Sequence, residues 1–333
     1  LDQIISKVVN IKIGSINSIR LQKKQIKLRN TMKILLLGKN GQVGWELQRA
    51  LQPLGEVIAL DRQTNPEGWC GDVANFAEIS KAFEQIRPDI VVNASAYTAV
   101  DKAESDAEQA HLINVLAVKH LAEECQKHSA LLIHYSTDYV FDGTGVLAWK
   151  EDDQRAPVNL YGQTKRDGEL ALEQSGVSFL NFRTCWVYAV RGNNFIKTML
   201  KLAQMKEELN IIQDQVGVPT GAALIADVTA QAIRYYTLQS DEQKILLHGH
   251  YHLAPTGETT WYDYAQFVFA QAREHNQPLI LKQVNPIETQ AYPTPAKRPL
   301  NSRLNTDKLQ QNFKLHLPHW QQGVAQVLEE LLP

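Results

Sequence analysis

The stretch from Lys33-Ile-Leu-Leu-Leu37 through Gly38-Lys-Asn-Gly41-Gln-Val-Gly44 decides the fold. Its apolar first part predicts a buried strand, and residues 42–51 predict a helix with one apolar face. Between them, glycines permit positive φ and let the backbone approach a pyrophosphate closely. The free N–H groups and the dipole at the helix start favour the same anion. This strand, glycine-rich turn and helix therefore predict a dinucleotide site, although the spacing is GxxGxxG rather than GxGxxG.

The chain then repeats the alternation of strand and helix. Strands are expected at 56–60, 89–93, 130–136 and 178–182, with helices at 79–86, 107–127 and 160–174. Continuous apolar strands separated by helices imply a parallel sheet covered on both faces, which is an α/β, doubly wound, Rossmann-type fold. After residue 188 the pattern loosens and prolines interrupt it, which predicts a smaller mixed α/β substrate lobe. The expected domains are 1–31, 32–188 and 189–333, with an approximate last boundary because the chain is free to recross.

Composition and charge exclude several classes of protein. The 333 residues, 44% apolar and 21% charged, suit one sizeable core with a second lobe, and a net charge of −2 predicts no nucleic-acid partner. Membrane spans and a secretory signal are not expected. Three widely separated cysteines favour a reducing compartment, so we expect a cytoplasmic protein.

Residues 1–31 differ from the rest of the chain, because they carry a net charge of +6 and end directly before the first strand. They are expected to be a disordered, dispensable extension. A basic targeting or membrane-touching segment is the alternative.

Further candidate cofactor residues follow the next strands. Asp61 closes the second strand, where a carboxylate accepts hydrogen bonds from ribose hydroxyls, whereas the adjacent Arg62 suits a 2′-phosphate. The two residues favour opposite cofactors, so NADH and NADPH both stay open. Asp72 and Val73 are expected to lie at the edge of the adenine. The small residues among 93–98 would let the cofactor pass close to the backbone.

The catalytic candidates are Tyr161 and Lys165, which share one helical face at i and i+4. A neighbouring cation lowers the pKa of a phenol, so the pair is suited to general acid catalysis of carbonyl reduction. Thr137 ends the preceding strand, where its hydroxyl is able to contact both the substrate oxygen and the phenol.

These motifs together resemble the extended short-chain dehydrogenases, and within them the dTDP-4-dehydrorhamnose reductases. The resemblance covers Met32 to the C-terminus and rests on six segments: residues 38–47, 99–104, 135–141, 183–188, 214–220 and 298–304. It implies NAD(P)H-dependent reduction of the C4 keto group of dTDP-4-dehydro-L-rhamnose, the last step of dTDP-L-rhamnose synthesis, with Tyr161 as the proton donor.

The resemblance also implies roles for individual residues. Lys165 would bind the nicotinamide ribose, and Thr137 would orient the proton transfer. Thr137, Asp138 and Trp186 would contact the sugar, although a tryptophan alone is more often a core residue. The cofactor would be held by Gly38, Gly41, Gln42, Val43, Gly44, Asp61, Arg62, Asp72, Val73, Ala96, Tyr97, Thr98, Tyr135, Tyr161 and Lys165.

Metal binding and assembly are less clearly indicated. Some members of the resembled family hold Mg²⁺ with glutamates at a subunit contact; Glu46 matches one position, but Ala223 stands at the second. Mg²⁺ prefers carboxylates, so no metal site is predicted here and Glu46 is the one candidate ligand. Whether the protein forms a homodimer is left open by the sequence.

Other signals have simple structural interpretations. His248, His250 and His252 alternate, which favours a half-exposed strand near the small lobe over a metal site. The acidic residues 101–108 are expected to form a solvated helix start.

Two rival functions are also compatible with the sequence. A nucleotide-sugar epimerase or another reductase of the same superfamily would use the same Tyr/Lys pair. A non-catalytic regulatory subunit on this fold would more naturally have lost that pair. One acid suffices for reduction, and Thr137 is followed by Asp138-Tyr139 rather than by the two adjacent carboxylates that a dehydratase needs.

Overall fold

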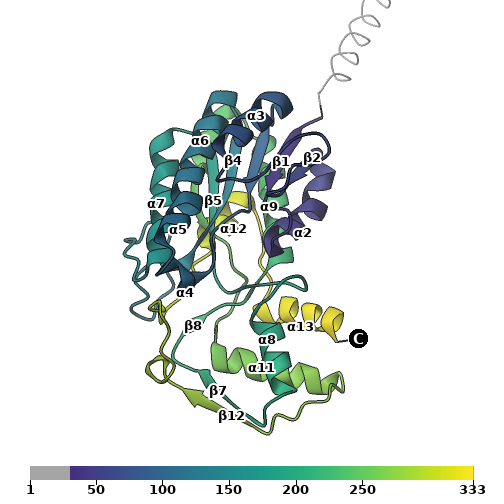
Figure 1. Ribbon diagram of the computed structural model, residues 1–333, viewed down its shortest axis with the longest axis vertical. Coiled ribbons are helices and arrows are strands. Elements are labelled where there is room, and N and C mark those ends of the chain that lie inside the picture. The colour runs from purple at the N-terminus through teal and green to yellow at the C-terminus, as the bar shows by residue number, and fades with distance from the viewer. Residues whose placement is uncertain (1–30, 333) are drawn as a thin grey trace, which may run out of the picture. The chain divides into compact units, whose positions relative to one another are not determined.

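Six parallel strands form the central sheet, in the order β10–β5–β4–β3–β1–β2 (Figure 1). The computed structural model describes residues 31–332. The expectations for the basic extension, residues 1–31, therefore concern residues outside the described part of the chain, except for residue 31. The five strands predicted before residue 188 are present within two residues of their expected bounds, and the doubly wound α/β fold is confirmed. The strands are β1 (Lys33–Leu37), β2 (Glu56–Leu60), β3 (Ile90–Asn93), β4 (Leu131–Thr137), β5 (Phe179–Thr184) and β10 (Gly249–His252).

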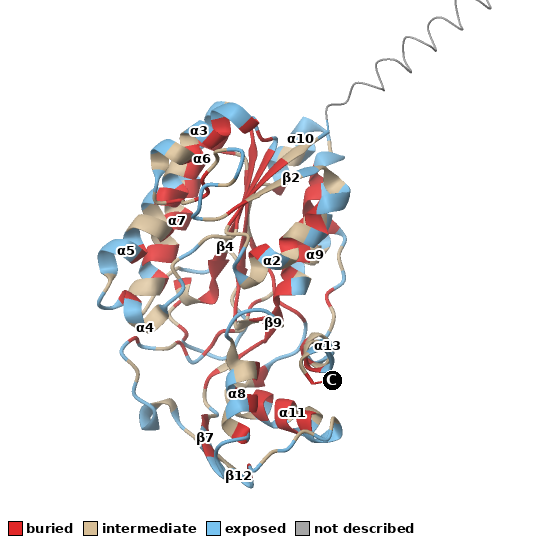
Figure 2. Cartoon of the chain, turned by 45° about the vertical axis from the view of Figure 1, so that its right-hand side comes forward, coloured by how far each residue is buried: buried red, intermediate tan, exposed pale blue. Residues whose placement is uncertain are grey.

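Helices cover both faces of this sheet, because its central strands are apolar on both sides (Figure 2). Helices α3 (Phe76–Ile86), α6 (Ala117–His128) and α7 (Leu160–Ser175) pack side by side on one face. On the opposite face, α2 (Gln42–Leu51) packs against α9 (Ala222–Thr237). Strand β1 lies between β2 and β3, so the strand order reverses beside it and a crevice opens at the carboxyl ends of β1 and β3.

The helix predicted over 107–127 is interrupted. It begins as α5 (Ala107–His111), widens into a π-helical turn at Leu112–Leu116 and continues as α6. Such turns occur often at functional sites. This turn buries Asn114, whose side chain binds the segment that follows β3.

The lower part of the molecule in Figure 1 has its own apolar core, which includes Tyr264, Phe269, Trp320 and Val324. It contains the parallel pair β7 (Glu208–Ile212) and β12 (Gln283–Ile287), with helices α8 (Phe195–Ala203), α11 (Trp261–Glu274) and α13 (Trp320–Leu331). Short elements complete the chain: α4 (Val100–Ala103), β6 (Val187–Tyr188), β8 (Val216–Gly217), β9 (Thr220–Gly221), α10 (Asp241–Leu247), β11 (Thr259–Thr260) and α12 (Asp307–Phe313).

The second half of the chain also returns to the main sheet. Strand β10 pairs with β5, and α12 packs against both β10 and α9. The expected half-exposed strand near the small lobe is therefore wrong. His250 and His252 belong to the edge strand of the main sheet, with His248 just before it, and His252 is fully buried. Local alternation of histidines could not reveal this long-range pairing. No helix within residues 31–332 is long and apolar enough to cross a membrane.

Candidate active site

A cavity of about 990 Å³ lies at the crevice beside β1. Gly38 has φ +83°, and a Cβ there would lie 2.8 Å from Ser95 Oγ and 2.9 Å from the Ala94 backbone. At Gly44 a Cβ would overlap the Gly38 carbonyl, so the turn and the first helical turn of α2 pack without side chains. The N–H groups of Gly38, Lys39 and Gly41 donate to backbone carbonyls, so a pyrophosphate would be bound by the N–H groups at the start of α2, which this turn without side chains lets it approach closely. The cavity is lined by Gly38, Gly41, Asp61, Arg62, Asp72, Val73, Ala96 and Tyr97 among the predicted cofactor residues.

Asp61 is fixed within this cavity by several donors. Its Oδ1 accepts a hydrogen bond from the Gln63 N–H at 2.9 Å, and its Oδ2 accepts one from Asn40 Nδ2 at 2.6 Å. Lys39 Nζ lies 3.6 Å from the same oxygen. The backbone hydrogen bond from Gln63, with the charge of Lys39, lowers the pKa of Asp61. The carboxylate therefore stays ionised but is partly neutralised by Lys39.

A second cavity of about 510 Å³ adjoins the start of α2 and extends towards α7. It brings together predicted catalytic, cofactor and sugar-binding residues from β3, β4, α7 and the turn after β5. The lining includes Gly41, Gln42, Val43, Ala96, Thr98, Tyr135, Thr137, Asp138, Tyr161, Lys165 and Trp186. Every predicted site residue except the buried Gly44 and the metal candidate Glu46 thus lines one cavity or the other.

Thr137 links the phenol to a buried carboxyl. Its Oγ1 donates to Asp138 Oδ1 at 3.0 Å and accepts the Tyr139 N–H at 3.2 Å. Asp138 is 2% exposed, and its Oδ2 has no hydrogen-bond partner within residues 31–332. Burial raises the pKa of Asp138 to about 7, and the nearby hydroxyls of Ser302 and Thr137 act in the opposite direction. An orphaned buried oxygen that lines a cavity is a ready acceptor or donor for a ligand hydroxyl.

Tyr161 lies half-buried in the same cavity. Burial raises its pKa above the usual value, although a hydrogen bond with Thr137 acts in the opposite direction. Lys165 was expected to lower the pKa of Tyr161. The pKa is raised instead, because desolvation of the phenol is the dominant effect. The phenol is consequently in its protonated form, which is the form that donates a proton.

Lys165 is held between β4 and α7. Its Nζ donates to the Tyr135 carbonyl oxygen at 2.7 Å and lies 3.4 Å from His134 Nε2. Burial lowers the pKa of Lys165 to about 8, whereas the Glu169 carboxylate raises it. The pKa of His134 is lowered, first by burial and then by Lys165, so the imidazole adds no second charge beside the amine.

Several site residues were missed by sequence reasoning. Trp261 lines the second cavity and stacks on Trp186, with ring centroids 3.6 Å apart. Asn114 Oδ1 accepts the Tyr97 N–H at 2.9 Å, and its Nδ2 donates to Thr164 at 3.1 Å. For Asn114, the available signal was an asparagine on the apolar face of a long helix. For Trp261, no local sequence pattern indicated a place in the site.

The acidic residues after β3 are not merely solvated, as was expected. Asp101 forms a 2.6 Å ion pair with Arg298, and Glu104 accepts the Leu160 N–H at 2.9 Å. These contacts join α4 to the chain near the C-terminus and to the start of α7. They depend on residues far away in sequence, so the local charge pattern could not predict them.

The metal candidate Glu46 does not fit a divalent cation. Its carboxylate lies 3.9 Å from Arg49 Nε, which competes with any cation for the same oxygen. Within residues 31–332, no group of three or more His, Cys, Asp or Glu side chains is arranged to hold a metal ion.

The chain is similar to known proteins over nearly all of the described residues. The family model for the RmlD substrate binding domain matches residues 32–332. The dTDP-4-dehydrorhamnose reductase of Escherichia coli K12 is 55% identical over 300 residues, covering 90% of this chain and 98% of that protein. The Shigella flexneri reductase is 53% identical with the same coverage. Among solved structures, a Bacillus anthracis dTDP-4-dehydrorhamnose reductase in complex with NADP is 30% identical, with TM-score 0.80 over 90% of this chain and 99% of that one.

The sheet order, the glycine turn at the strand reversal and the Tyr161/Lys165 pair define a nicotinamide-dependent oxidoreductase of the extended short-chain dehydrogenase type. Identity at this level over this coverage also resolves the family. The chain belongs to the dTDP-4-dehydrorhamnose reductase family, as its sequence motifs indicated.

Proposed function

We propose that this protein reduces the C4 keto group of dTDP-4-dehydro-L-rhamnose to give dTDP-L-rhamnose, with Tyr161 as the proton donor. The observation that carries the proposal is the shared cavity of Tyr161, Lys165, Thr137 and Asp138 next to the glycine cradle. The names of two similar relatives, from Escherichia coli K12 and Shigella flexneri, supply the substrate.

The two cavities support the proposed binding of NADPH or NADH. The adenine and its ribose would lie beside Asp61, Arg62 and Asp72, and the pyrophosphate at the start of α2. Lys165 would bind the nicotinamide ribose through its ammonium group, because Nζ retains donors beyond the one used by Tyr135. When bound, the cofactor supplies a hydride to the sugar carbon.

The protein groups would handle the charge that develops on the sugar oxygen. Tyr161 would transfer its phenolic proton to that oxygen, since an alkoxide is a stronger base than a phenolate. Thr137 would orient the transfer, because its hydroxyl donates to Asp138 at rest and would donate to the phenolate oxygen once the phenolic proton has left. The free Oδ2 of Asp138 would bind a sugar hydroxyl.

Incubation with dTDP-4-dehydro-L-rhamnose and either reduced cofactor tests the proposal directly. We expect stoichiometric loss of reduced cofactor and a product with two added hydrogens, identified as dTDP-L-rhamnose by NMR. An isomeric product without net cofactor use would favour an epimerase instead. Binding of cofactor without turnover of any keto sugar would favour a regulatory subunit.

A further inference from the structure

Two tryptophans from distant parts of the chain form one wall of the 510 Å³ cavity. Trp186 follows β5, and Trp261 begins α11. Their rings stack with centroids 3.6 Å apart and an interplanar angle of 16°. Phe195 packs against Trp261 at 4.6 Å. Trp261 therefore contacts both other rings, and both tryptophans line the cavity.

Trp186 has an unusual backbone, with φ +46°. Residues other than glycine rarely adopt a positive φ, and those that do are held in this conformation by their surroundings. One restraint is Gly217, where a Cβ would lie 2.8 Å from Trp186 Cε2. The stacked ring of Trp261 is the second restraint.

Trp261 is itself fixed by a chain of hydrogen bonds. Its Nε1 donates to Gln215 Oε1 at 3.0 Å, and Gln215 Nε2 donates to Thr289 Oγ1 at 3.1 Å. Thr289 Oγ1 in turn donates to Asp214 at 2.6 Å. Because the indole N–H is already used, Trp261 contributes only apolar ring surface to the cavity.

We propose that Trp261 is a positioning residue that holds Trp186 against the sugar, and that the stacked pair selects 6-deoxy sugars by contact with their methyl-bearing face. This inference rests on the proposed function, because it deepens the substrate assignment. The C6 carbon of the sugar is two bonds from the reacting C4. A wall in the cavity that contains Tyr161 is therefore well placed to contact C6.

The chemistry of the wall favours a methyl group over a hydroxymethyl group. Aromatic carbon gains free energy from covering apolar surface, whereas a hydroxyl placed there loses hydrogen bonds to water. A pocket of this kind discriminates by roughly 10–200-fold for a change of one small group. We expect selectivity within that range rather than absolute exclusion.

Calorimetric binding of dTDP, dTDP-L-rhamnose and its 6-hydroxy counterpart dTDP-L-mannose tests the inference without turnover. For the wild type, we expect dTDP-L-rhamnose to bind about 10-fold or more tightly than dTDP-L-mannose. Trp261→Ala should lose most of this difference while leaving dTDP and NADPH affinity within about twofold. Trp261→Phe should retain it, because a stacking ring remains. Trp149→Ala is the control, since Trp149 stacks on Phe141 and lines neither of the two cavities.

Three outcomes would overturn the inference: equal binding of both sugars by the wild type, undiminished selectivity in Trp261→Ala, or loss of dTDP and NADPH binding together with selectivity. Failure of the proposed function is distinguishable, because it would appear as absent turnover of the keto sugar by the wild type. In kinetics, the loss in Trp261→Ala should appear mainly as a higher KM for the sugar nucleotide rather than as a lower kcat.

Discussion

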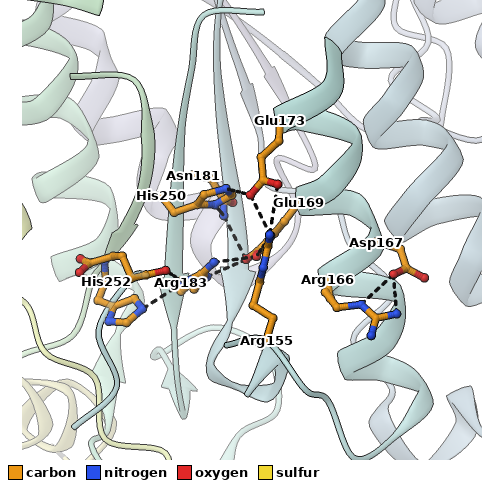
Figure 3. Close-up of polar contacts among 10 residues, drawn as sticks. Arg155, Arg166, Asp167, Glu169, Glu173, Asn181, Arg183, His250 and His252 are labelled. Atoms are coloured by element: carbon orange, nitrogen blue, oxygen red, sulfur yellow. Dashed lines mark hydrogen bonds and ion pairs between the residues drawn. The ribbon is translucent and has the colours of Figure 1, made fainter. Parts of the chain in front are cut away.

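The Arg183 guanidinium binds the Glu169 carboxylate through two parallel hydrogen bonds, Nε to Oε1 at 2.9 Å and Nη2 to Oε2 at 2.8 Å (Figure 3). Both side chains are almost fully buried, on β5 and on α7 respectively. Asn181 and Arg155 also donate to Glu169. The pair therefore fixes the helix that carries Tyr161 and Lys165 to the sheet.

Arg183→Met should strongly destabilise the protein, because it leaves the Glu169 charge buried with only part of its compensation. Loss of one partner of a buried pair typically costs about 3–5 kcal/mol, which urea unfolding would measure. Arg166→Met is the matched control. Arg166 pairs with the partly exposed Asp167, so we expect a change of about 0.5 kcal/mol or less. Equal unfolding midpoints for the two variants would contradict the importance of the buried pair.

Stability should fall at acidic pH through Glu173. The hydrogen bond with His250, followed by Arg155, lowers the pKa of Glu173 to about 2. A depressed folded-state pKa contributes stability that is fully present above the unfolded value, near 4.5, and is lost as the pH falls towards 2. Glu173→Gln should flatten the dependence of unfolding free energy on pH in this window. If the unfolding free energy of Glu173→Gln depended on acidic pH as the wild type does, the pKa of Glu173 would be the same in the folded and unfolded states.

Tyr161→Phe should reduce kcat by roughly 10²–10⁴-fold, because the ring remains while the proton is lost. NADPH affinity, measured by fluorescence titration, should persist. Tyr292→Phe removes a hydroxyl from an exposed tyrosine and should leave turnover unchanged. Near wild-type turnover in Tyr161→Phe would remove Tyr161 from the role of proton donor.

Cofactor preference should be weak. Lys39 partly neutralises Asp61, and Arg62 lines the same cavity, so we expect the site to accept both a 2′-phosphate and a bare ribose. We expect NADH and NADPH to differ by about one order of magnitude or less, roughly 1.4 kcal/mol. Arg62→Ala should weaken the binding of NADPH more than that of NADH. Arg87→Ala should affect the binding of neither cofactor, because Arg87 is exposed and lines neither cavity. Equal weakening of both cofactors by Arg62→Ala would exclude phosphate recognition.

Chelation of divalent metals should leave the reaction nearly unchanged. Glu46 has Arg49 beside it, and a lone carboxylate binds Mg²⁺ weakly, so EDTA should alter initial rates by about twofold or less. Ala223→Glu would add a second carboxylate; any effect is expected on metal-dependent association, measured by sedimentation, rather than on kcat. A rate lost with EDTA and restored by Mg²⁺ at constant ionic strength would contradict this.

Much of the fold was predictable because its signals are local. Apolar runs such as Lys33–Leu37, followed by glycines and an amphipathic helix, determine strand, turn and helix without help from distant residues. The i, i+4 spacing of Tyr161 and Lys165 likewise follows from helix geometry alone. These features sufficed for the fold class, whereas the family required the six motif segments between residues 38 and 304.

Tertiary structure alone decided the features that depend on distant segments. The pairing of β10 with β5 buried His252, and the meeting of Trp186 with Trp261 built the wall of the second cavity. Burial also raised the pKa of Tyr161, whereas the local pattern predicted a lower value. Desolvation and long-range contact depend on the whole surroundings of a side chain, which the order of residues within one helix or strand does not contain.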